Sequence, residues 1–446
     1  MRDSSCRQAH DEIVMWLTRL HGMKTPFSIA QIYGKHLLVC SLLLASTLFY
    51  LQALPGDTPS NLEQCKNMLM GSFVGDAATM PVHWVYDQEE LKKSANCSYI
   101  LYHSPSICPF YTYLKGSFSP YGDESIPLMS SMIENPSMVF IKPRAVQFML
   151  DFFKNYKGRL SELPKSFLVT KGTSSSDDVQ AHGIVKVPLI VARYHNSPEV
   201  YKKIHEMVGI LQTNPIPIRA SHTLAYILLH LLNVDTSDTS LEAVLRDLAT
   251  KTPPLPEIDL NYVKISYDDE LLLTMVDLKR KLMVLANSPD ESIDSRRIKK
   301  IMNAIILKTF KTEDPLLITI ENVKSNLNED EVNALNKATA ASLFNPGSNP
   351  VESRVTSIQE VLETLGLSCS LPSAFIGALY IARKCWYNLE EALVQNAMSG
   401  GDSCARAMII GSILGAMKGT VIPPSLIGGM STLIQDNVRK SLKICR

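Results

Sequence analysis

Hydrophobic residues recur with a helical period along most of the chain after residue 68. In the segment Ser221–Val234, apolar side chains fall on almost every side of a helix, which is typical of a buried helix. Leu241–Leu248 and Leu271–Ala286 repeat the helical spacing with charged residues on one side. Alternation of apolar and polar residues, which marks strands, is scarce. The pattern predicts an all-α fold of about twelve helices around one core.

The same spacing predicts further helices on both sides of this region. They are expected at Gln147–Phe153, Val185–Tyr194, Val351–Leu365, Ala374–Asn388, Leu389–Met398 and Cys404–Lys418. Residues 235–335 are more polar and contain turn-forming runs such as KTPPLPE and NLNEDE. We interpret them as a peripheral lobe or insertion within one domain of residues 61–446.

The N-terminal extension, residues 1–60, differs from the rest of the chain in its pattern of apolar and charged residues. Residues 37–54 form a run of 18 residues without a charge, just long enough to span a bilayer. One interpretation is a membrane anchor with residues 1–36 in the cytosol, and another is a signal peptide read from Met23. The protein would then be membrane-anchored or secreted, and the triplet Asn96-Cys97-Ser98 would suit a lumenal body. The remaining alternatives, a buried helix or a wrongly joined upstream exon, leave the protein cytoplasmic.

Composition narrows the functional classes. The chain has 446 residues, of which 46% are hydrophobic, so it can build a sizeable core. Lys and Arg number 44, as do Asp and Glu, and this balance argues against a chain-wide basic surface for nucleic acid. Nine cysteines occur without a CxxC pair, which excludes the usual zinc modules.

Four acidic motifs stand at the edges of apolar helices, and two of them lie in the first third of the body. In GSFVGDAATMPVHW, the glycines Gly71 and Gly75 let another backbone approach, and Asp76 and His83 follow them. In SPYGDES, Asp123-Glu124 opens a predicted helix after a proline. Adjacent carboxylates there favour a hard cation, or they serve the positive N-terminal end of the helix dipole.

The other two acidic motifs are SSSDDVQAHG and SGGDSCAR. Asp177 and Asp178 follow serines, which predicts a capped helix start with acids in its first turn. Gly401, Asp402 and Ser403 precede an apolar helix whose glycines at 411, 415 and 419 predict close packing in a soluble core. If the four motifs converge, their oxygen ligands would suit one or two Mg²⁺ ions rather than Zn²⁺.

These motifs, in this order, resemble the ADP-ribosylglycohydrolase family, and within it the branch that contains the jellyfish J-crystallins. The matching phrases are GSFVGDAATMPVHWVYD (71–87), SPYGDES (119–125), SSDDVQAHGIVKVPLIVARY (175–194), GLSCSLPSAF (366–375) and GGDSCARAMIIGSILGAMKG (400–419). The resemblance implies an orthogonal multi-helix fold, a Mg²⁺ site, and hydrolysis of a glycosidic bond to ADP-ribose by a metal-held water.

Residue by residue, the resemblance implies distinct roles. It assigns Asp123 and Glu124 to catalysis, Asp76, His83, Asp177, Asp178 and Gly401 to substrate binding, and Asp123, Glu124, Asp402 and Ser403 to the metal. The family's Thr-Asp-Asp is here Gly122-Asp123-Glu124, and its Gly-Gly-Asp-Thr-Asp-Thr/Ser has Cys404 and Ala405 at the last two positions. A neutral thiol is a poor ligand for a hard ion. Two functions therefore remain: a Mg²⁺-assisted hydrolase acting on ADP-ribosylated substrates, or a catalytically degenerate binding or structural protein of the crystallin kind.

Overall fold

Helices make up nearly all the regular structure of this chain. The computed structural model describes residues 59–237, 239–287, 293–309, 323–343 and 357–445. Within these ranges three isolated β-bridges occur, and no strand is present. The all-α prediction is therefore confirmed for the described part of the chain.

The helices fall into three groups along the sequence. The N-terminal group is α3 (Pro59–Thr79), η1 (Met80–Val82), α4 (Gln88–Cys97), α5 (Pro120–Ile133), α6 (Lys142–Asn155), α7 (Glu162–Val169), η2 (Ile184–Lys186), α8 (Val187–Tyr194), α9 (Val200–Val208) and α10 (Pro215–Asn233). The middle group is α11 (Leu241–Thr250), α12 (Leu260–Tyr267), α13 (Asp269–Ala286), α14 (Ser295–Thr309) and α16 (Glu329–Leu343). The C-terminal group is α17 (Ile358–Leu365), α18 (Ser373–Lys384), α19 (Leu389–Ser399), α20 (Ser403–Ala416), α21 (Pro424–Gly429), α22 (Thr432–Ser441) and η4 (Leu442–Ile444).

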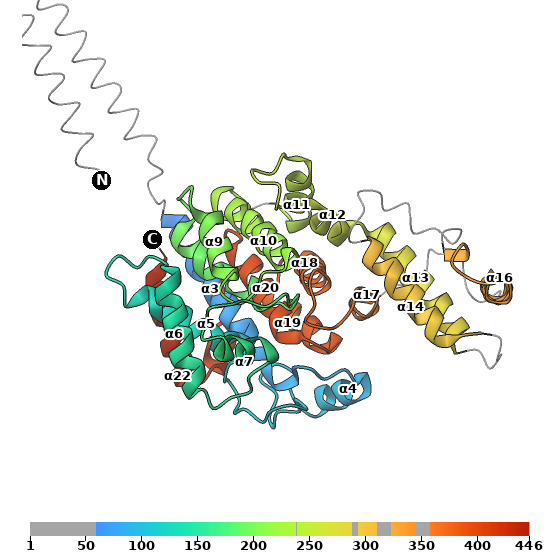
Figure 1. The fold of residues 1–446 in the computed structure, drawn as a ribbon, viewed down its shortest axis with the longest axis horizontal. Coiled ribbons are helices and arrows are strands. Elements are labelled where there is room, and N and C mark those ends of the chain that lie inside the picture. Colours follow the sequence, from blue (N-terminus) through green and yellow to red (C-terminus); the bar gives the residue numbers. More distant parts are fainter. Residues whose placement is uncertain (1–58, 238, 288–292, 310–322, 344–356, 446) are drawn as a thin grey trace, which may run out of the picture. The chain divides into compact units, whose positions relative to one another are not determined.

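The centre of the domain is the pair α3 and α20, which lie against each other backbone to backbone (Figure 1). A Cβ atom added at Gly71 would lie 2.2 Å from the carbonyl oxygen of Gly411, and one added at Gly415 would lie 2.2 Å from that of Asn67. Every residue of α20 is buried. Only glycine allows so close a contact. This one interface therefore explains the glycine spacing in the GSFVGD motif and in the helix that follows the SGGDSCAR motif.

Other helices pack around this pair. Helices α10, α18 and α19 contact α20, while α5, α8, α21 and α22 contact α3. In the middle group, α11 and α12 pack against α18, and α14 and α16 pack against α13. The proposed division into an extension, a domain and a polar lobe at 235–335 stays a prediction.

The predicted helices agree with the structure in most places. The segments Ser221–Val234 and Cys404–Lys418 correspond to α10 and α20. The helix expected over Val351–Leu365 is seen from Ile358, and its first residues lie outside the described ones. The apolar run 37–54 also lies outside them. Across the residues that the structure describes, none of the helices combines the length and hydrophobicity that a bilayer crossing requires.

The helix start predicted at Asp177 and Asp178 is wrong. Residues 170–183 form turns and irregular segments with two isolated β-bridge residues, Ser176 and Gln180, and helical structure begins at Ile184. The Asp178 carboxylate accepts a hydrogen bond from the backbone N–H of Gln180, and the Gln212 amide donates to the carbonyl oxygens of Asp178 and Gln180. Since these bonds satisfy the backbone locally, the segment has no need of a helix.

The α3–α20 interface makes a direct prediction about stability. Gly411→Ala should lower the free energy of unfolding by about 1–3 kcal/mol or more, because its Cβ would lie 2.0 Å from the Gly71 carbonyl oxygen. Gly428→Ala, in open space on α21, is the matched control and should change stability by less than about 0.5 kcal/mol. Urea denaturation followed by circular dichroism measures both. Equal midpoints for the two variants would contradict the interpretation.

Candidate functional site

Three helix ends meet beside the α3–α20 contact and bring acidic residues together. Asp76 lies near the C-terminal end of α3, Asp123 and Glu124 lie in the first turns of α5, and Asp402 caps the N-terminus of α20. The side chains of Asp76 and Asp402 are fully buried, and that of Glu124 is nearly so. Buried carboxylates must find hydrogen-bond donors or cations, so their partners determine what this site can do.

Asp76 is bound by the start of α5. One of its oxygens accepts a hydrogen bond from the Ser119 backbone N–H at 2.8 Å, and the other accepts from the Ser119 hydroxyl. Burial raises the pKa of Asp76 to about 7; the bonds from Ser119 oppose this shift, and the negative charges of Asp123 and Asp402 add to it. Near neutral pH this carboxyl group is therefore protonated in a large fraction of molecules, and it links α3 to α5.

Asp402 follows a double-glycine turn. Gly400 and Gly401 have φ angles of 77° and 67°, in the left-handed region that favours glycine. The Gly401 N–H and carbonyl pair with Val85 and Trp84, which fixes the turn against the end of the first motif. One Asp402 oxygen accepts from the Ala405 N–H at 3.1 Å, and the other accepts from the Tyr121 hydroxyl at 2.7 Å.

A buried guanidinium group holds the same turn from inside. Arg406 donates to the Asn396 side-chain oxygen at 2.8 Å, to the Leu367 carbonyl at 3.3 Å, and to the Gly400 carbonyl. Burial lowers the pKa of Arg406 to about 10, and the charge of Asp402 works against that shift. Arg406 thus remains cationic at neutral pH and places a positive charge near Asp402.

Glu124 is neutralised by two basic residues from the third motif. Its Oε2 atom accepts hydrogen bonds from His182 Nδ1 at 2.9 Å and Lys186 Nζ at 3.0 Å, and all three side chains are buried. Burial alone would raise the pKa of Glu124, but the charges and hydrogen bonds of these partners lower it to about 2. We call Glu124, His182 and Lys186 the buried triad.

Asp123, the neighbour of Glu124, points to a different partner. It is partly exposed and accepts a hydrogen bond from the Tyr156 hydroxyl at 2.6 Å. Burial raises the pKa of Asp123 to about 6, while the bond from Tyr156 opposes the shift and the charge of Glu124 adds to it. The two adjacent carboxylates therefore do not share one ligand.

The two positions that depart most from the family pattern are closely packed. The Cys404 sulfur lies 3.6 Å from the Thr79 hydroxyl and 3.7 Å from the Asp76 carbonyl oxygen, and burial raises the pKa of this thiol well above its usual range. A Cβ added at Gly122 would lie 2.3 Å from Asp76 Oδ2 and 2.7 Å from Phe118 Cγ. A hydroxyl side chain at 122 therefore cannot enter without displacing Asp76.

The acidic side chains gathered here do not fit a Mg²⁺ site. Mg²⁺ requires carboxylate or neutral oxygens in octahedral geometry, whereas here the carboxylates of Asp76, Glu124 and Asp402 already accept hydrogen bonds from protein groups. Lys186 and Arg406 add fixed positive charge. In the ranges that the structure covers, no three His, Cys, Asp or Glu side chains are grouped to hold a metal ion.

The remaining residues predicted for the site occupy different places. Ser403 is buried and donates to the Thr79 carbonyl oxygen at 3.4 Å, beside the acidic residues. His83 is also buried there, and its Nδ1 accepts from the Cys404 N–H at 3.3 Å. Asp177 is exposed and accepts from the Asn214 amide at 2.9 Å, so it stands apart from the buried cluster. Asp178 serves the turn at Gln180 described above.

An aromatic rim covers His83, and the motifs did not reveal most of it. We define the rim as Trp84, Phe110, Tyr111, Tyr113 and Arg159. Tyr111 and Tyr113 stack with ring centroids 4.2 Å apart, and Trp84 meets Phe110 edge to face at 5.1 Å. The exposed Arg159 guanidinium lies over Phe110 at 4.5 Å and over Trp84 at 5.4 Å.

His83 supplies a neutral donor beneath this rim. Burial lowers its pKa to about 4, with Asp402 opposing the shift and Arg406 adding to it. Because Nδ1 accepts a hydrogen bond, the proton of the neutral ring resides on Nε2. Neither this Nε2 nor the Tyr111 hydroxyl has a hydrogen-bond partner within the described residues, although both are buried.

Sequence reasoning overlooked His182 and Lys186, although a signal existed. Lys186 interrupts the apolar run GIVKVPLIV, and a lysine inside a buried helix requires an anionic partner. His182 precedes it by four residues, a spacing that places two side chains on one helical face. The rim gave no comparable signal, because Arg159 and Trp84 are 75 residues apart in the chain.

Comparisons with known proteins complete the description. The family model for ADP-ribosylglycohydrolase matches residues 57–443. Crystallin J1A of Tripedalia cystophora is 25% identical over 232 residues, which are 47% of this chain and 69% of that protein. Crystallin J1B of the same organism is 39% identical over 74 residues, 16% of this chain and 23% of that protein.

A solved structure, an ADP-ribosylglycohydrolase-related protein complex, aligns with a TM-score of 0.48 and 11% identity, covering 87% of this chain and 99% of the other. The family model spans most of the chain and includes all four acidic motifs. The resemblance of those motifs is thereby confirmed, and the chain belongs to the ADP-ribosylglycohydrolase family.

Proposed function

We propose that this chain is a non-hydrolytic member of its family that binds ADP-ribose or an ADP-ribosylated group without Mg²⁺. The observation that carries the proposal is the set of partners of the acidic residues. Glu124 is held in the buried triad, and Asp76 and Asp402 accept hydrogen bonds from Ser119, Ala405 and Tyr121. Carboxylates engaged in this way are held by the fold, and each has fewer lone pairs left for a metal ion.

Electrostatics supports the same proposal. Metal-assisted hydrolysis needs a cation that lowers the pKa of a bound water, and the cation needs anionic oxygens around it. Asp76 is protonated in a large fraction of molecules near neutral pH, and the Cys404 thiol is neutral. Lys186 compensates Glu124. Asp76 and Cys404 therefore add little negative charge for a divalent ion, and the charge of Glu124 is compensated within the protein.

The aromatic rim supports the binding half of the proposal. A base can stack on the exposed Phe110 or on the partly exposed Trp84, and Arg159 can meet a diphosphate. The rim adjoins the acidic cluster. Trp84 follows His83 in the chain, and the backbone N–H of Trp84 donates a hydrogen bond to the carbonyl oxygen of Gly401. The crystallin names of the two relatives also fit a family branch in which a non-catalytic role occurs.

Hydrolysis is the second candidate, and one observation favours it. The charges of Asp76, Asp123 and Asp402 still influence one another, and Asp76 and Asp123 have pKa values of about 7 and 6. Carboxyl groups with such values can act as general acid or base near neutral pH. A metal-independent hydrolase would therefore cleave ADP-ribose linkages in the presence of EDTA, a result that would overturn the non-hydrolytic proposal.

The first prediction concerns Cys404. Cys404→Asp should lower the free energy of unfolding by about 1–3 kcal/mol or more, because it places a second buried carboxylate next to Asp76 and against the Asp76 carbonyl oxygen, which cannot donate to it. Titration calorimetry should show no gain in Mg²⁺ affinity, even with Gly122→Thr and Ala405→Thr added. Cys404→Ser, similar in size and uncharged, is the control. Tight Mg²⁺ binding by Cys404→Asp would show that a ligand cage is present.

The second prediction concerns the buried triad. Glu124→Gln and Lys186→Met should each cost about 3–5 kcal/mol of stability, because each leaves a buried charge without its partner. The double variant should lose clearly less than the sum of the two. The exposed pair Glu162–Lys165 is the control, where Lys165→Met should cost about 0.2–1 kcal/mol. Additive losses in the double variant would mean that Glu124 and Lys186 are not coupled.

The third prediction concerns ligand binding. ADP-ribose should bind with the same affinity in EDTA and in millimolar Mg²⁺, as measured by titration calorimetry. Trp84→Ala should weaken binding by about 1–3 kcal/mol if a base stacks on this ring. Tyr387→Ala, which removes an exposed aromatic ring beyond the end of α18, should leave the affinity unchanged. Binding that requires Mg²⁺ would refute the metal-free arrangement.

A further inference from the structure

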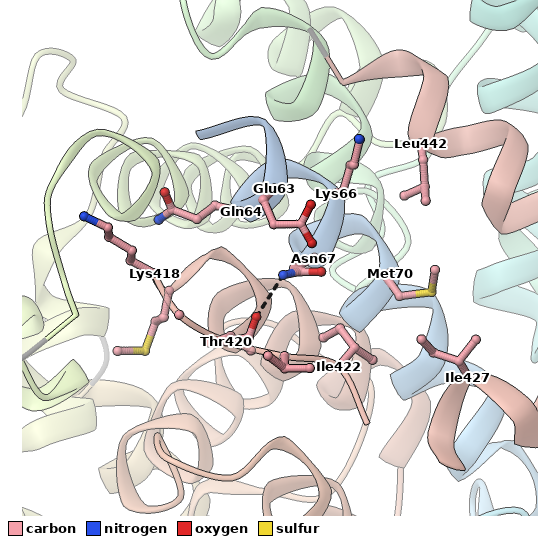
Figure 2. A pocket seen from close by; sticks show the side chains of 13 residues that line it. Glu63, Gln64, Lys66, Asn67, Met70, Lys418, Thr420, Ile422, Ile427 and Leu442 are labelled. Atoms are coloured by element: carbon pink, nitrogen blue, oxygen red, sulfur yellow. Dashed lines mark hydrogen bonds between the residues drawn. The ribbon is translucent and has the colours of Figure 1, made fainter. Parts of the chain in front are cut away.

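A cavity lies at the other end of α3, away from the acidic residues. Its volume is about 500 Å³, within the range of small-molecule sites. Lys66 and Asn67 on its wall precede Asp76 by nine to ten residues, so about 15 Å of helix separates the two places. Figure 2 shows that the side chains around it come from α3, the segment after α20, α21 and η4.

The cavity has an apolar floor. Met70, Met417, Ile422, Ile427 and Leu442 line it. Met417 and Ile422 are buried, whereas Met70, Ile427 and Leu442 are partly exposed, so part of this floor is accessible from the cavity. An apolar surface of this kind favours a ligand with a hydrocarbon body.

Charged side chains stand at the mouth. Lys418 is already paired with Asp235 at 2.7 Å. Lys66, by contrast, is partly buried and has no ion-pair partner in the part of the chain that the structure covers. Its neighbour Glu63 is exposed to solvent. A lysine that stands above an apolar floor without a counter-ion is complementary to an anionic head group.

The neutral polar side chains of the cavity already form hydrogen bonds within the protein. Asn67 donates to the Thr420 carbonyl oxygen at 2.8 Å, a bond drawn in Figure 2. The Gln64 amide donates to the carbonyl oxygens of Leu231 and Ala416 at 3.0 and 2.9 Å. These bonds hold the walls in place independently of a ligand, so Lys66 and the exposed Glu63 are the charged groups of the α3 wall that remain available.

We propose that this cavity binds an amphiphilic carboxylate, with the carboxylate at Lys66 and the hydrocarbon chain on the floor of Met70, Ile422, Ile427 and Leu442. A purely polar anion would leave the floor unused, and a cationic amphiphile would meet Lys66 and Lys418 at the mouth. The site is separate from the acidic cluster and does not depend on the function proposed there.

The test is titration of the full chain with decanoate, with decanol and decyltrimethylammonium as probes of the head-group charge. Decanoate should bind at one site per chain. Lys66→Gln should weaken decanoate about tenfold, in the range of one charge-assisted hydrogen bond, and should leave decanol unchanged. Glu63→Gln is the matched variant of opposite sign: it should strengthen decanoate binding, because it removes a nearby negative charge.

Tryptophan substitutions that occupy the space above the apolar floor should distinguish binding in this cavity from nonspecific binding elsewhere. Ile427→Trp and Met70→Trp should each abolish saturable binding of both decanoate and decanol, with melting temperatures confirming that the variants fold. ADP-ribose affinity should be unchanged in Lys66→Gln. Absence of saturable decanoate binding, equal binding of the cationic amphiphile, or full binding in both folded tryptophan variants would each overturn the proposal.

Discussion

The close contact between α3 and α20 is the constraint on which the rest of the structure depends. Gly71, Gly411 and Gly415 let the two backbones touch; α20 is buried along its whole length, and α3 is buried from Gly71 to its end. The contact also places Asp76 beside Cys404 and brings the Asp402 turn against the end of the first motif. Acidic side chains carried by such helix ends have no access to bulk water, so the protein itself must supply their partners.

The partners of these carboxylates explain how acidic side chains are accommodated in the core of this fold. Ser119, Tyr121 and Ala405 satisfy Asp76 and Asp402 through hydrogen bonds. Lys186 meets Glu124 in the buried triad. An ion pair removed from water is strongly stabilised only while both members remain. These carboxylates are therefore integral parts of the packed core.

Much of the fold follows from local patterns, whereas the site follows only in part. Helical periodicity identified α10 and α20, and the double glycine before Asp402 correctly indicated a helix start. Asp177 failed as a predicted helix start, because Asp178 and Gln180 form a turn that the distant Gln212 holds in place, and periodicity does not describe such a contact. The aromatic rim depends on pairings between distant segments, such as Arg159 with Trp84, for which a single sequence contains no local signal.

The departures from the family motifs are physically connected. Gly122 leaves room for the Asp76 carboxylate, which would collide with a Cβ at that position. Cys404 packs on Asp76 and Thr79 as a neutral group. Introducing the family's ligand at position 122 or 404 alone therefore disturbs a neighbouring side chain. The effects of several such substitutions on stability are not additive. If the chain is metal-free as proposed, building a metal site here would require Gly122, Cys404 and the partners of Glu124 to change together. This interdependence is what is expected of a site whose residues have been fitted to one another as a structural core.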